Sequence, residues 1–275
     1  MAPLAHTLAL LAMAVATVAI EVVPLDLAKS SFDDQYLKCS VTIKSQELQD
    51  SDFLKNEKFK YGWKIARERW KERGSVSYPL TPDQAIALLA YTMRETDLYR
   101  RFNEAVRTAG KSSWEYWNEF HFKSLHLLLT QALQKLRRPN DCKNVFRGVR
   151  NYHFDAKQGY EVCFGQFTST SLNENVAQDF GQATMFKVRT CHGVDIQRFS
   201  MYPKEEEVLI PPFEIFKVIG VSKSWNTMHI ELQSTGNSSN YDCEWLKGGS
   251  LSRNSPHLEG FLLATVAMAV ATRTL

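Results

Sequence analysis

The feature that most constrains the fold of this chain is a change of periodicity at Pro139 and Asn140. Residues 50–136 carry helix-type patterns, and the chain after Asn140 breaks into short β-type runs. The expected strands cover residues 145–149, 162–168, 184–189, 206–210, 215–221 and 228–232. Helices first and strands second predict an α+β domain. The sequence shows neither an internal repeat nor a second domain.

Two predicted helices have clear sequence signals. Thr81 precedes Pro82, and Gln84 follows three positions after Thr81, which is the pattern of a capped helix start. The residues after it, 85–93, are rich in helix formers. Residues 124–136 present a broad apolar face at helical spacing. Both segments are therefore expected to be helices that pack against a core.

Residues 64–73 form a basic cluster with Trp63 and Trp70 interleaved, which is one pattern of a nucleic-acid surface. The cluster also contains Glu68 and Glu72, and its apolar residues fall near helical spacing. The net charge of the whole chain is only +3, so the charge balance does not demand a nucleic-acid partner. The pattern favours the solvated side of an amphipathic helix.

A run of three carboxylates carries most of the chemical information. Residues 202–212 read YPKEEEVLIPP, so a turn marked by Pro leads through the carboxylates into an apolar β-type run. Alternation along a strand predicts that Glu205 and Glu207 share one face and that Glu206 points to the other. In a cleft, each of these two carboxylates would raise the pKa of the other, and they could divide charge stabilisation and proton transfer between them. The alternative is a solvated acidic turn before a strand.

Two upstream motifs complete a pattern with this run. Residues 145–149 read VFRGV, with Arg147 before a Gly, and residues 164–171 read FGQFTSTS. In this order, with VLIPP after the last Glu, the sequence resembles the vertebrate ecto-ADP-ribosyltransferases, the arginine-specific mono-ADP-ribosyltransferases related to cholera-type toxins. The resemblance extends over residues 39–243. It implies a helical N-terminal part, a split β-sheet with an NAD cleft, NAD as co-substrate, and no metal.

The resemblance also implies a role for each motif residue. Glu207 would stabilise the positive charge that develops on the ribose, and Glu205 would hold the acceptor guanidinium and help remove its proton. Arg147 would anchor the NAD diphosphate and the adjoining ribose, and Ser169 would hydrogen-bond Glu207. Some relatives carry Gln in place of Glu205 and hydrolyse NAD, so Glu at this position indicates a transferase. Taken alone, Arg147 would also fit a surface strand and Ser169 a polar turn.

Further NAD contacts follow from the same resemblance. Gly148 would let the backbone approach nicotinamide closely, and Phe180 would stack on nicotinamide. Tyr91 would line the adenosine side of the cleft. The remaining candidates are Gln166, Ser200 and Tyr202. Each of these residues would fit core or turn structure equally well.

The two ends of the chain predict processing and an extracellular location. Residues 1–19 read as a signal peptide, since residues 8–20 are almost all apolar and residues 17–19 give a small-x-small cleavage pattern. At the other end, a polar spacer precedes a terminal apolar stretch, which is the pattern of a glycosylphosphatidylinositol anchor. The candidate attachment residues are Gly248, Gly249 and Ser250. We therefore expect a catalytic domain over residues 20–249 and a propeptide over residues 250–275, with simple secretion as the alternative.

Five cysteines in such a chain predict two disulfides and one leftover thiol. The sequence alone permits many pairings. The family resemblance implies that Cys39 pairs with Cys243 and that Cys142 pairs with Cys191. Cys163 is then the odd residue, and its apolar neighbours favour a buried, inert thiol.

These observations predict an extracellular, monomeric enzyme that transfers ADP-ribose from NAD to arginine side chains of proteins and releases nicotinamide. A usable glycosylation sequon at Asn237 fits the same compartment. No Cys or His spacing supports a zinc site, and no Gly-rich motif supports a Rossmann or P-loop nucleotide site. The alternatives are an enzyme that mainly hydrolyses NAD, and a cell-surface binding protein that keeps the fold without turnover.

Overall fold

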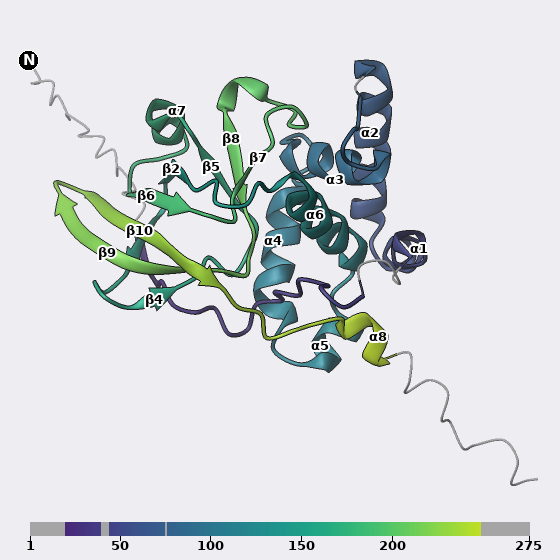
Figure 1. Cartoon of the computed structure of the whole chain (residues 1–275), viewed down its shortest axis with the longest axis horizontal. Coiled ribbons are helices and arrows are strands. Elements are labelled where there is room, and N and C mark those ends of the chain that lie inside the picture. Colours follow the sequence, from purple (N-terminus) through teal and green to yellow (C-terminus); the bar gives the residue numbers. More distant parts are fainter. Residues whose placement is uncertain (1–19, 40–43, 75, 249–275) are drawn as a thin grey trace, which may run out of the picture.

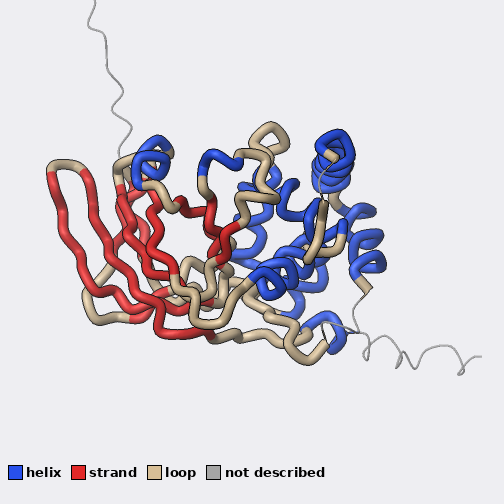
Figure 2. Tube along the Cα trace, turned by 45° about the horizontal axis from the view of Figure 1, so that its top comes forward, coloured by secondary structure: helices blue, strands red, loops and turns tan. Residues whose placement is uncertain are grey.

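The computed structural model describes residues 20–39, 44–74 and 76–248, and it consists of a helical part beside a sheet part (Figure 1). The helical part contains α1 (Ser45–Lys55), α2 (Glu57–Arg73), α3 (Pro82–Thr92), α4 (Leu98–Ala109), α5 (Ser113–Asn118) and α6 (Lys123–Leu136). Figure 2 shows these helices gathered on one side and the strands on the other. The predicted α+β class is confirmed.

The main sheet is eight-stranded, and it divides near its middle. Its order is β4-β9-β10-β6-β2-β5-β8-β7. The strands are β2 (Lys143–Val149), β4 (Glu161–Val162), β5 (Thr168–Ser171), β6 (Thr184–Thr190), β7 (Val194–Asp195), β8 (Glu207–Ile210), β9 (Glu214–Ser224) and β10 (Thr227–Asn237). A single register pair, Phe146 with Ser171, joins β2 to β5, whereas β2 pairs with β6 along its whole length. The sheet is therefore split at β2 and β5, as expected.

Smaller elements complete the fold. β1 (Glu21–Pro24) pairs in parallel with β3 (Tyr152–Asp155) in a separate two-stranded sheet. A short helix, α7 (Glu174–Asp179), follows β5, and α8 (Glu244–Gly248) ends the described part of the chain. These short elements have too few residues for a clear period, so the sequence analysis did not predict them.

The predicted helix start at α3 is confirmed in atomic detail. The Gln84 amide donates to Thr81 Oγ1 at 3.2 Å, and Gln84 Oε1 accepts from the Thr81 amide at 3.0 Å. The helix begins at Pro82. Two N–H groups at the helix start thus gain partners, which stabilises the first turn.

The basic cluster lies on an amphipathic helix, as predicted. α2 buries Trp63, Ala66 and Trp70, and its Lys and Arg side chains in this segment are exposed. The two tryptophans therefore belong to the core rather than to a nucleic-acid surface.

The expectation of one strand over residues 162–168 is wrong. β4 ends at Val162, β5 begins at Thr168, and Gly165 between them has a φ of 63°. The apolar run serves two different cores: Phe164 packs against Phe186 in the sheet, and Phe167 packs against aromatic side chains of the helical part. The left-handed backbone of Gly165 turns the chain between these two contacts, so the run forms a bent loop.

β8 lies between two buried apolar clusters of the described residues. Leu209 belongs to the cluster of the helical part, and Val208 and Ile210 belong to the cluster of the sheet. All four residues of β8 are buried as a result. The first residue of β8 is Glu207, so the fold carries this carboxylate into the interior.

Both predicted disulfides are confirmed. Cys39 pairs with Cys243 and ties the N-terminal segment to the start of α8. Cys142 pairs with Cys191 and joins the start of β2 to the end of β6. Cys163 is a free, buried thiol, and burial raises its pKa to about 11, which keeps it protonated and unreactive.

Several predictions concern residues at the edges of the described chain. The predicted signal peptide, the propeptide, Gly249 and Ser250 lie outside the described residues, and Gly248 is the last residue of α8. Among the described residues, no helix has the length and apolar character needed to cross a membrane. Asn237 is exposed at the end of β10, and its glycosylation stays a prediction.

Candidate active site

A cleft of about 520 Å³ opens where β2 separates from β5. α3, α4, β2, β5, α7 and the start of β8 all contribute to its walls. The predicted site residues that line this cleft are Tyr91, Arg147, Gly148, Gln166, Ser169, Phe180, Glu205 and Glu207. The cleft thus brings together residues from both halves of the chain, on either side of the change in periodicity.

Glu207 is the most deeply buried carboxylate of the cleft. Glu207 is only 6% exposed, and burial raises the pKa of its carboxyl group to about 7. A hydrogen bond from Ser169 and a second from Ser200, whose Oγ lies 3.3 Å from Glu207 Oε2, favour the charged form, whereas the nearby charge of Glu205 disfavours it. Ser169 therefore lies near Glu207, and its role in holding the carboxylate stays a prediction.

Ser200 differs from its prediction. Ser200 is fully buried behind Glu207 and is not among the residues that line the cleft. Its hydroxyl also accepts a hydrogen bond from the Tyr202 amide at 3.1 Å. The structure thus gives Ser200 the position of a support for the carboxylate.

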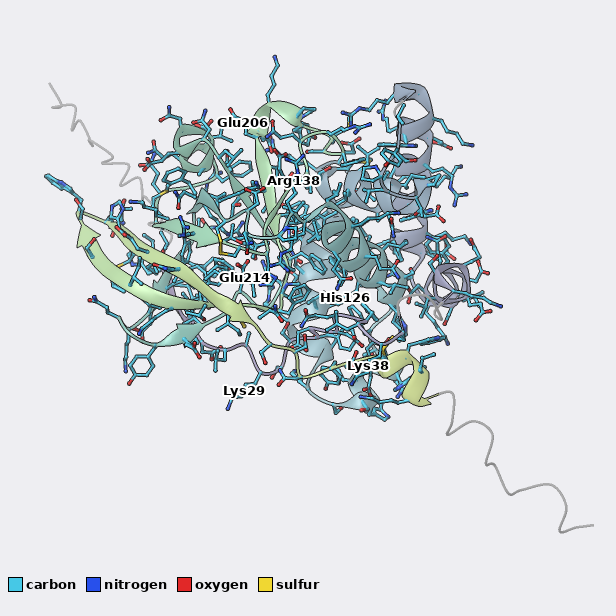
Figure 3. The ribbon with its side chains drawn as sticks, viewed as in Figure 1. Lys29, Lys38, His126, Arg138, Glu206 and Glu214 are labelled. Atoms are coloured by element: carbon cyan, nitrogen blue, oxygen red, sulfur yellow. A yellow bond between two sulfur atoms is a disulfide. The ribbon has the colours of Figure 1, made fainter. Side chains whose placement is uncertain are left out.

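Glu205 and Glu207 reach the same cleft by a route that differs from simple strand alternation. The strand begins at Glu207 rather than at residue 206, and Glu205 ends a 3₁₀ turn, Pro203–Glu205. Between them Glu206 adopts a left-handed backbone with a φ of 49°. Figure 3 shows Glu206 in the turn that precedes β8. The left-handed residue reverses the chain, and Glu206 itself does not line the cleft.

β5 holds this acidic turn in place. The Ser171 hydroxyl donates to the Glu205 carbonyl at 2.7 Å, and the Leu172 amide donates to the Glu206 carbonyl at 3.1 Å. Burial raises the pKa of Glu205, and the ion pair with Arg94 opposes this shift. The two carboxylates are consequently fixed side by side in different environments.

Arg147 lies at the point where the sheet splits. It projects from β2, and its Nη1 donates to the Ser169 carbonyl on β5 at 2.8 Å. A guanidinium carries five N–H groups, and this bond engages one of them. Burial lowers the pKa of Arg147, but an arginine stays charged at any physiological pH. The cleft therefore contains a fixed cation across from the two carboxylates.

Comparison with known proteins decides the family. Residues 25–240 match the family model described as NAD:arginine ADP-ribosyltransferase. The chain belongs to this family. It is 49% identical over 235 residues to the erythroblast NAD(P)(+)-arginine ADP-ribosyltransferase of Gallus gallus, covering 83% of this chain and 78% of that protein. It is 44% identical over 240 residues to the GPI-linked NAD(P)(+)-arginine ADP-ribosyltransferase 1 of Mus musculus, covering 82% and 74%.

Solved structures support the same assignment. The mono-ADP-ribosyltransferase ART2.2, crystallised as a mutant in complex with NADH, is 37% identical with a TM-score of 0.69, covering 81% of this chain and 98% of that one. Exoenzyme S from Pseudomonas aeruginosa is 20% identical with a TM-score of 0.51, covering 79% and 95%, and shows the fold alone. The predicted ADP-ribosyltransferase fold is confirmed.

The charges of the cleft fit the co-substrate of this family. The cationic residues of the lining are Arg94, Arg100, Arg107, Arg147 and Arg150, and the anionic ones are Glu104, Glu205 and Glu207. Guanidinium groups suit the phosphate oxygens of a dinucleotide. In the described parts of the chain, no group of three or more His, Cys, Asp or Glu side chains could hold a metal ion.

Tyr91, the residue predicted to line the adenosine side, belongs to a connected hydrogen-bond network. The Tyr91 hydroxyl donates to the Phe167 carbonyl at 2.9 Å, and Asn103 Nδ2 donates to both of these oxygens at 3.0 Å. Arg107, one helical turn after Asn103 on α4, donates through Nη1 to Gln166 Oε1. Tyr91 is 2% exposed, and in this ADP-ribosyltransferase it both lines the cleft and joins α3 to Phe167, the residue before β5.

Arg94 is a cleft residue that the sequence analysis missed. It lies in the loop between α3 and α4, and its Nη2 donates to Glu205 Oε1. The guanidinium carbon lies 5.1 Å from the ring centroid of Phe180 and 4.7 Å from that of Tyr202. Tyr202 thus meets the site through Arg94, since it is not among the lining residues. No periodic pattern marks Arg94, because its partners are distant in sequence.

Gly148 has a structural reason for being glycine. A Cβ at this position would lie 2.1 Å from the Ala177 carbonyl oxygen and 2.3 Å from that of Gly181. Both atoms belong to the backbone of α7 and the residues after it, so neither can move aside independently. The close approach found in the structure is between β2 and α7, which ends beside Phe180.

Proposed function

We propose that this chain transfers ADP-ribose from NAD to arginine side chains of proteins and releases nicotinamide. The observation that carries the proposal is the placement of Glu205 and Glu207 in one cleft with Arg147. Membership of the NAD:arginine ADP-ribosyltransferase family and the names of the relatives support it. ART2.2 mutants were crystallised in complex with NADH and with NAD, which supports NAD as the co-substrate here.

Glu207 has the position needed to stabilise the reacting ribose. As the bond between ribose C1′ and the nicotinamide nitrogen breaks, its electron pair leaves with nicotinamide, and positive charge develops on the ribose. A buried carboxylate stabilises that charge more in the transition state than in the ground state. Ser169 and Ser200 hold the carboxylate through their hydrogen bonds.

Glu205 has the position needed to direct the acceptor. One guanidinium nitrogen of the target arginine forms the new bond to C1′ and loses a proton, for which Glu205 is the acceptor. Its side chain is 25% exposed, so a target protein can reach it from solvent. Arg147 and the linked pair of Arg107 and Gln166, which line the same cleft, would hold the diphosphate and the adjoining ribose.

The change Glu205→Gln should separate transfer from hydrolysis. The amide introduced by this change cannot accept the guanidinium proton, whereas Glu207 can still assist the departure of nicotinamide. We expect the ratio of ADP-ribose transferred to agmatine over nicotinamide released to fall at least about a hundredfold, the lower end of what a single acid–base group contributes. The measurement uses labelled NAD with and without agmatine. An unchanged ratio in Glu205→Gln would remove the proposed role of Glu205.

The same experiment distinguishes the two rival functions. Nicotinamide release by the wild-type protein without transfer to agmatine would indicate an NAD hydrolase. NAD binding without nicotinamide release would indicate a silent binding protein.

The pH profile of nicotinamide release should follow the ionisation of Glu207. Its folded pKa is raised to about 7, so it is neutral and inactive at pH 5 and charged at pH 8. We expect kcat/KM for NAD to rise about tenfold per pH unit below pH 7 and to level off above it. In Ser200→Ala the charged form loses a hydrogen bond, so the profile should move to higher pH. A flat profile between pH 5 and 8 would contradict the assignment.

The cellular placement is a further part of the proposal. GPI-linked relatives of Mus musculus, Oryctolagus cuniculus and Homo sapiens, together with the two disulfides, support an extracellular protein that is anchored through its C-terminus. Its partners would then be arginine-bearing proteins at the cell surface or outside the cell, with the enzyme acting as a monomer. Phospholipase release from intact cells would test the anchor against simple secretion.

A further inference from the structure

The guanidinium of Arg94 forms an ion pair with Glu205, the carboxylate that the proposed reaction needs to bind its acceptor arginine. Arg94 pairs with Glu205, and its flat cation lies near the rings of Phe180 and Tyr202. The three partners come from the acidic turn, from the residue that caps α7 and from the residue before the 3₁₀ turn. The contacts converge on one side chain from two segments that are distant in sequence, the end of α7 and residues 202–205.

These contacts are of the kind that a substrate arginine would make. A guanidinium is recognised by a carboxylate at its edge and by aromatic rings at its face. Arg94 and an incoming arginine therefore require the same oxygens of Glu205. We propose that Arg94 is a specificity-determining residue that competes with the acceptor arginine for Glu205. The inference rests on the proposed function, because it takes Glu205 as the residue that directs the acceptor.

The exposure of the pair makes the competition reversible. The side chain of Arg94 is 51% exposed and that of Glu205 is 25% exposed, and ion pairs in contact with water are weakly held. Arg94 also projects from a loop of a few residues between α3 and α4, so it can swing aside without unwinding a helix. The transfer step then requires Arg94 to leave Glu205 before the acceptor can be deprotonated.

The test compares transfer to agmatine, a small guanidine, by wild type, Arg94→Gln and Arg94→Lys. If Arg94 occupies Glu205 about four-fifths of the time, it weakens the apparent affinity for agmatine about fivefold. We therefore expect the KM for agmatine to fall about fivefold in Arg94→Gln, with no matching fall in the KM for NAD. Arg94→Lys should fall between, because an ammonium keeps the charge but lacks the flat face.

Arg101→Gln is the matched control. Arg101 is an exposed arginine in the first turn of α4, and its Nε lies 3.9 Å from Asp97 Oδ2. It is not among the residues lining the cleft. Its replacement removes the same charge a short distance away and should leave the KM for agmatine unchanged. Equal falls in Arg94→Gln and Arg101→Gln would mean that general charge, rather than competition, sets the KM, and would overturn the proposal.

The outcomes separate this inference from the proposed function. If Glu205→Gln loses transfer while Arg94→Gln leaves the KM for agmatine unchanged or raises it, competition by Arg94 is wrong and the role of Glu205 stands. If Glu205→Gln retains transfer, the proposed role of Glu205 is wrong, and the inference about Arg94, which depends on that role, is wrong with it. Calorimetric titration with agmatine gives a readout without turnover: the affinity gain of Arg94→Gln should vanish in the Glu205→Gln background.

Discussion

Glu207→Gln should lose about a thousandfold in the rate of nicotinamide release and yet unfold less readily than the wild type at pH 8. The loss of rate follows because the neutral amide cannot stabilise positive charge on the ribose. Removing a single preorganised electrostatic group costs about 10²–10³ in rate in well-studied enzymes. The rate is measured as nicotinamide released from NAD at saturating concentration and pH 8.

The gain in stability follows from the burial of the same carboxylate. Its folded pKa is raised from 4.5 to about 7, so the folded state holds a proton that the unfolded state has already released. The contribution of Glu207 to the free energy of unfolding is therefore greatest below pH 4.5 and is lost as the pH rises through 7. Above pH 7 the charged, buried carboxylate costs about 3 kcal/mol, which Gln removes. The difference in thermal midpoint between mutant and wild type should shrink toward pH 5.

Glu206→Gln is the control for this prediction. It removes the same charge from the neighbouring position, and Glu206 does not line the cleft. We expect its rate of nicotinamide release to stay within about twofold of wild type, as is usual for a change away from the reacting atoms. A thousandfold loss in Glu206→Gln as well would mean that the acidic turn acts as a whole and that Glu207 has no separate role.

Gly148→Ala should damage both stability and NAD binding. The new Cβ would meet two backbone carbonyl oxygens, of Ala177 and Gly181, at 2.1 and 2.3 Å. α7 must then move away from β2 and carry Phe180 with it. Overpacking costs about 1–3 kcal/mol, and backbone obstacles place this change at the upper end. We expect a lower unfolding free energy in denaturant titration and a higher KM for NAD.

Gly220→Ala offers a matched comparison in the same sheet. A Cβ at Gly220 in β9 would lie 3.5 Å from Glu231 Cβ, which is ordinary van der Waals contact. This substitution should change the unfolding free energy by less than about 1 kcal/mol and leave the KM for NAD unchanged. If the two variants behaved alike, the close approach of α7 to β2 would not be what holds the cleft in shape.

The parts of the site that the sequence could predict are those marked by local motifs. The Arg, Ser-Thr-Ser and Glu-Glu-Glu patterns are short and distinctive, and so their residues could be located without a structure. The helix start at Thr81 was equally readable, because capping uses residues three positions apart. The disulfide pairs came from the family pattern rather than from the cysteine spacing, which permits many pairings.

The parts that escaped prediction depend on contacts between distant segments. Glu206 adopts a left-handed backbone, and no glycine in the sequence signals it. Glu205 and Glu207 line the same cleft as predicted, but a turn rather than alternation along a strand brings them together. Arg94 meets Glu205 across more than a hundred residues of sequence, and nothing local indicates the pair. The run at 162–168 was mistaken for one strand because an apolar run does not reveal that Gly165 within it adopts a left-handed backbone.

The positions of α8 and of the acidic turn bear on what the enzyme can reach. In Figures 1 and 3, α8 lies at the lower right of the molecule, and the turn with Glu206 lies at its upper edge. A lipid attached just beyond α8 would therefore seat the helix nearest the bilayer and turn the reactive mouth outward. Target proteins would then approach from the extracellular fluid or from an apposed cell. Arginines close to the membrane that carries the enzyme would face the side of the enzyme away from its cleft.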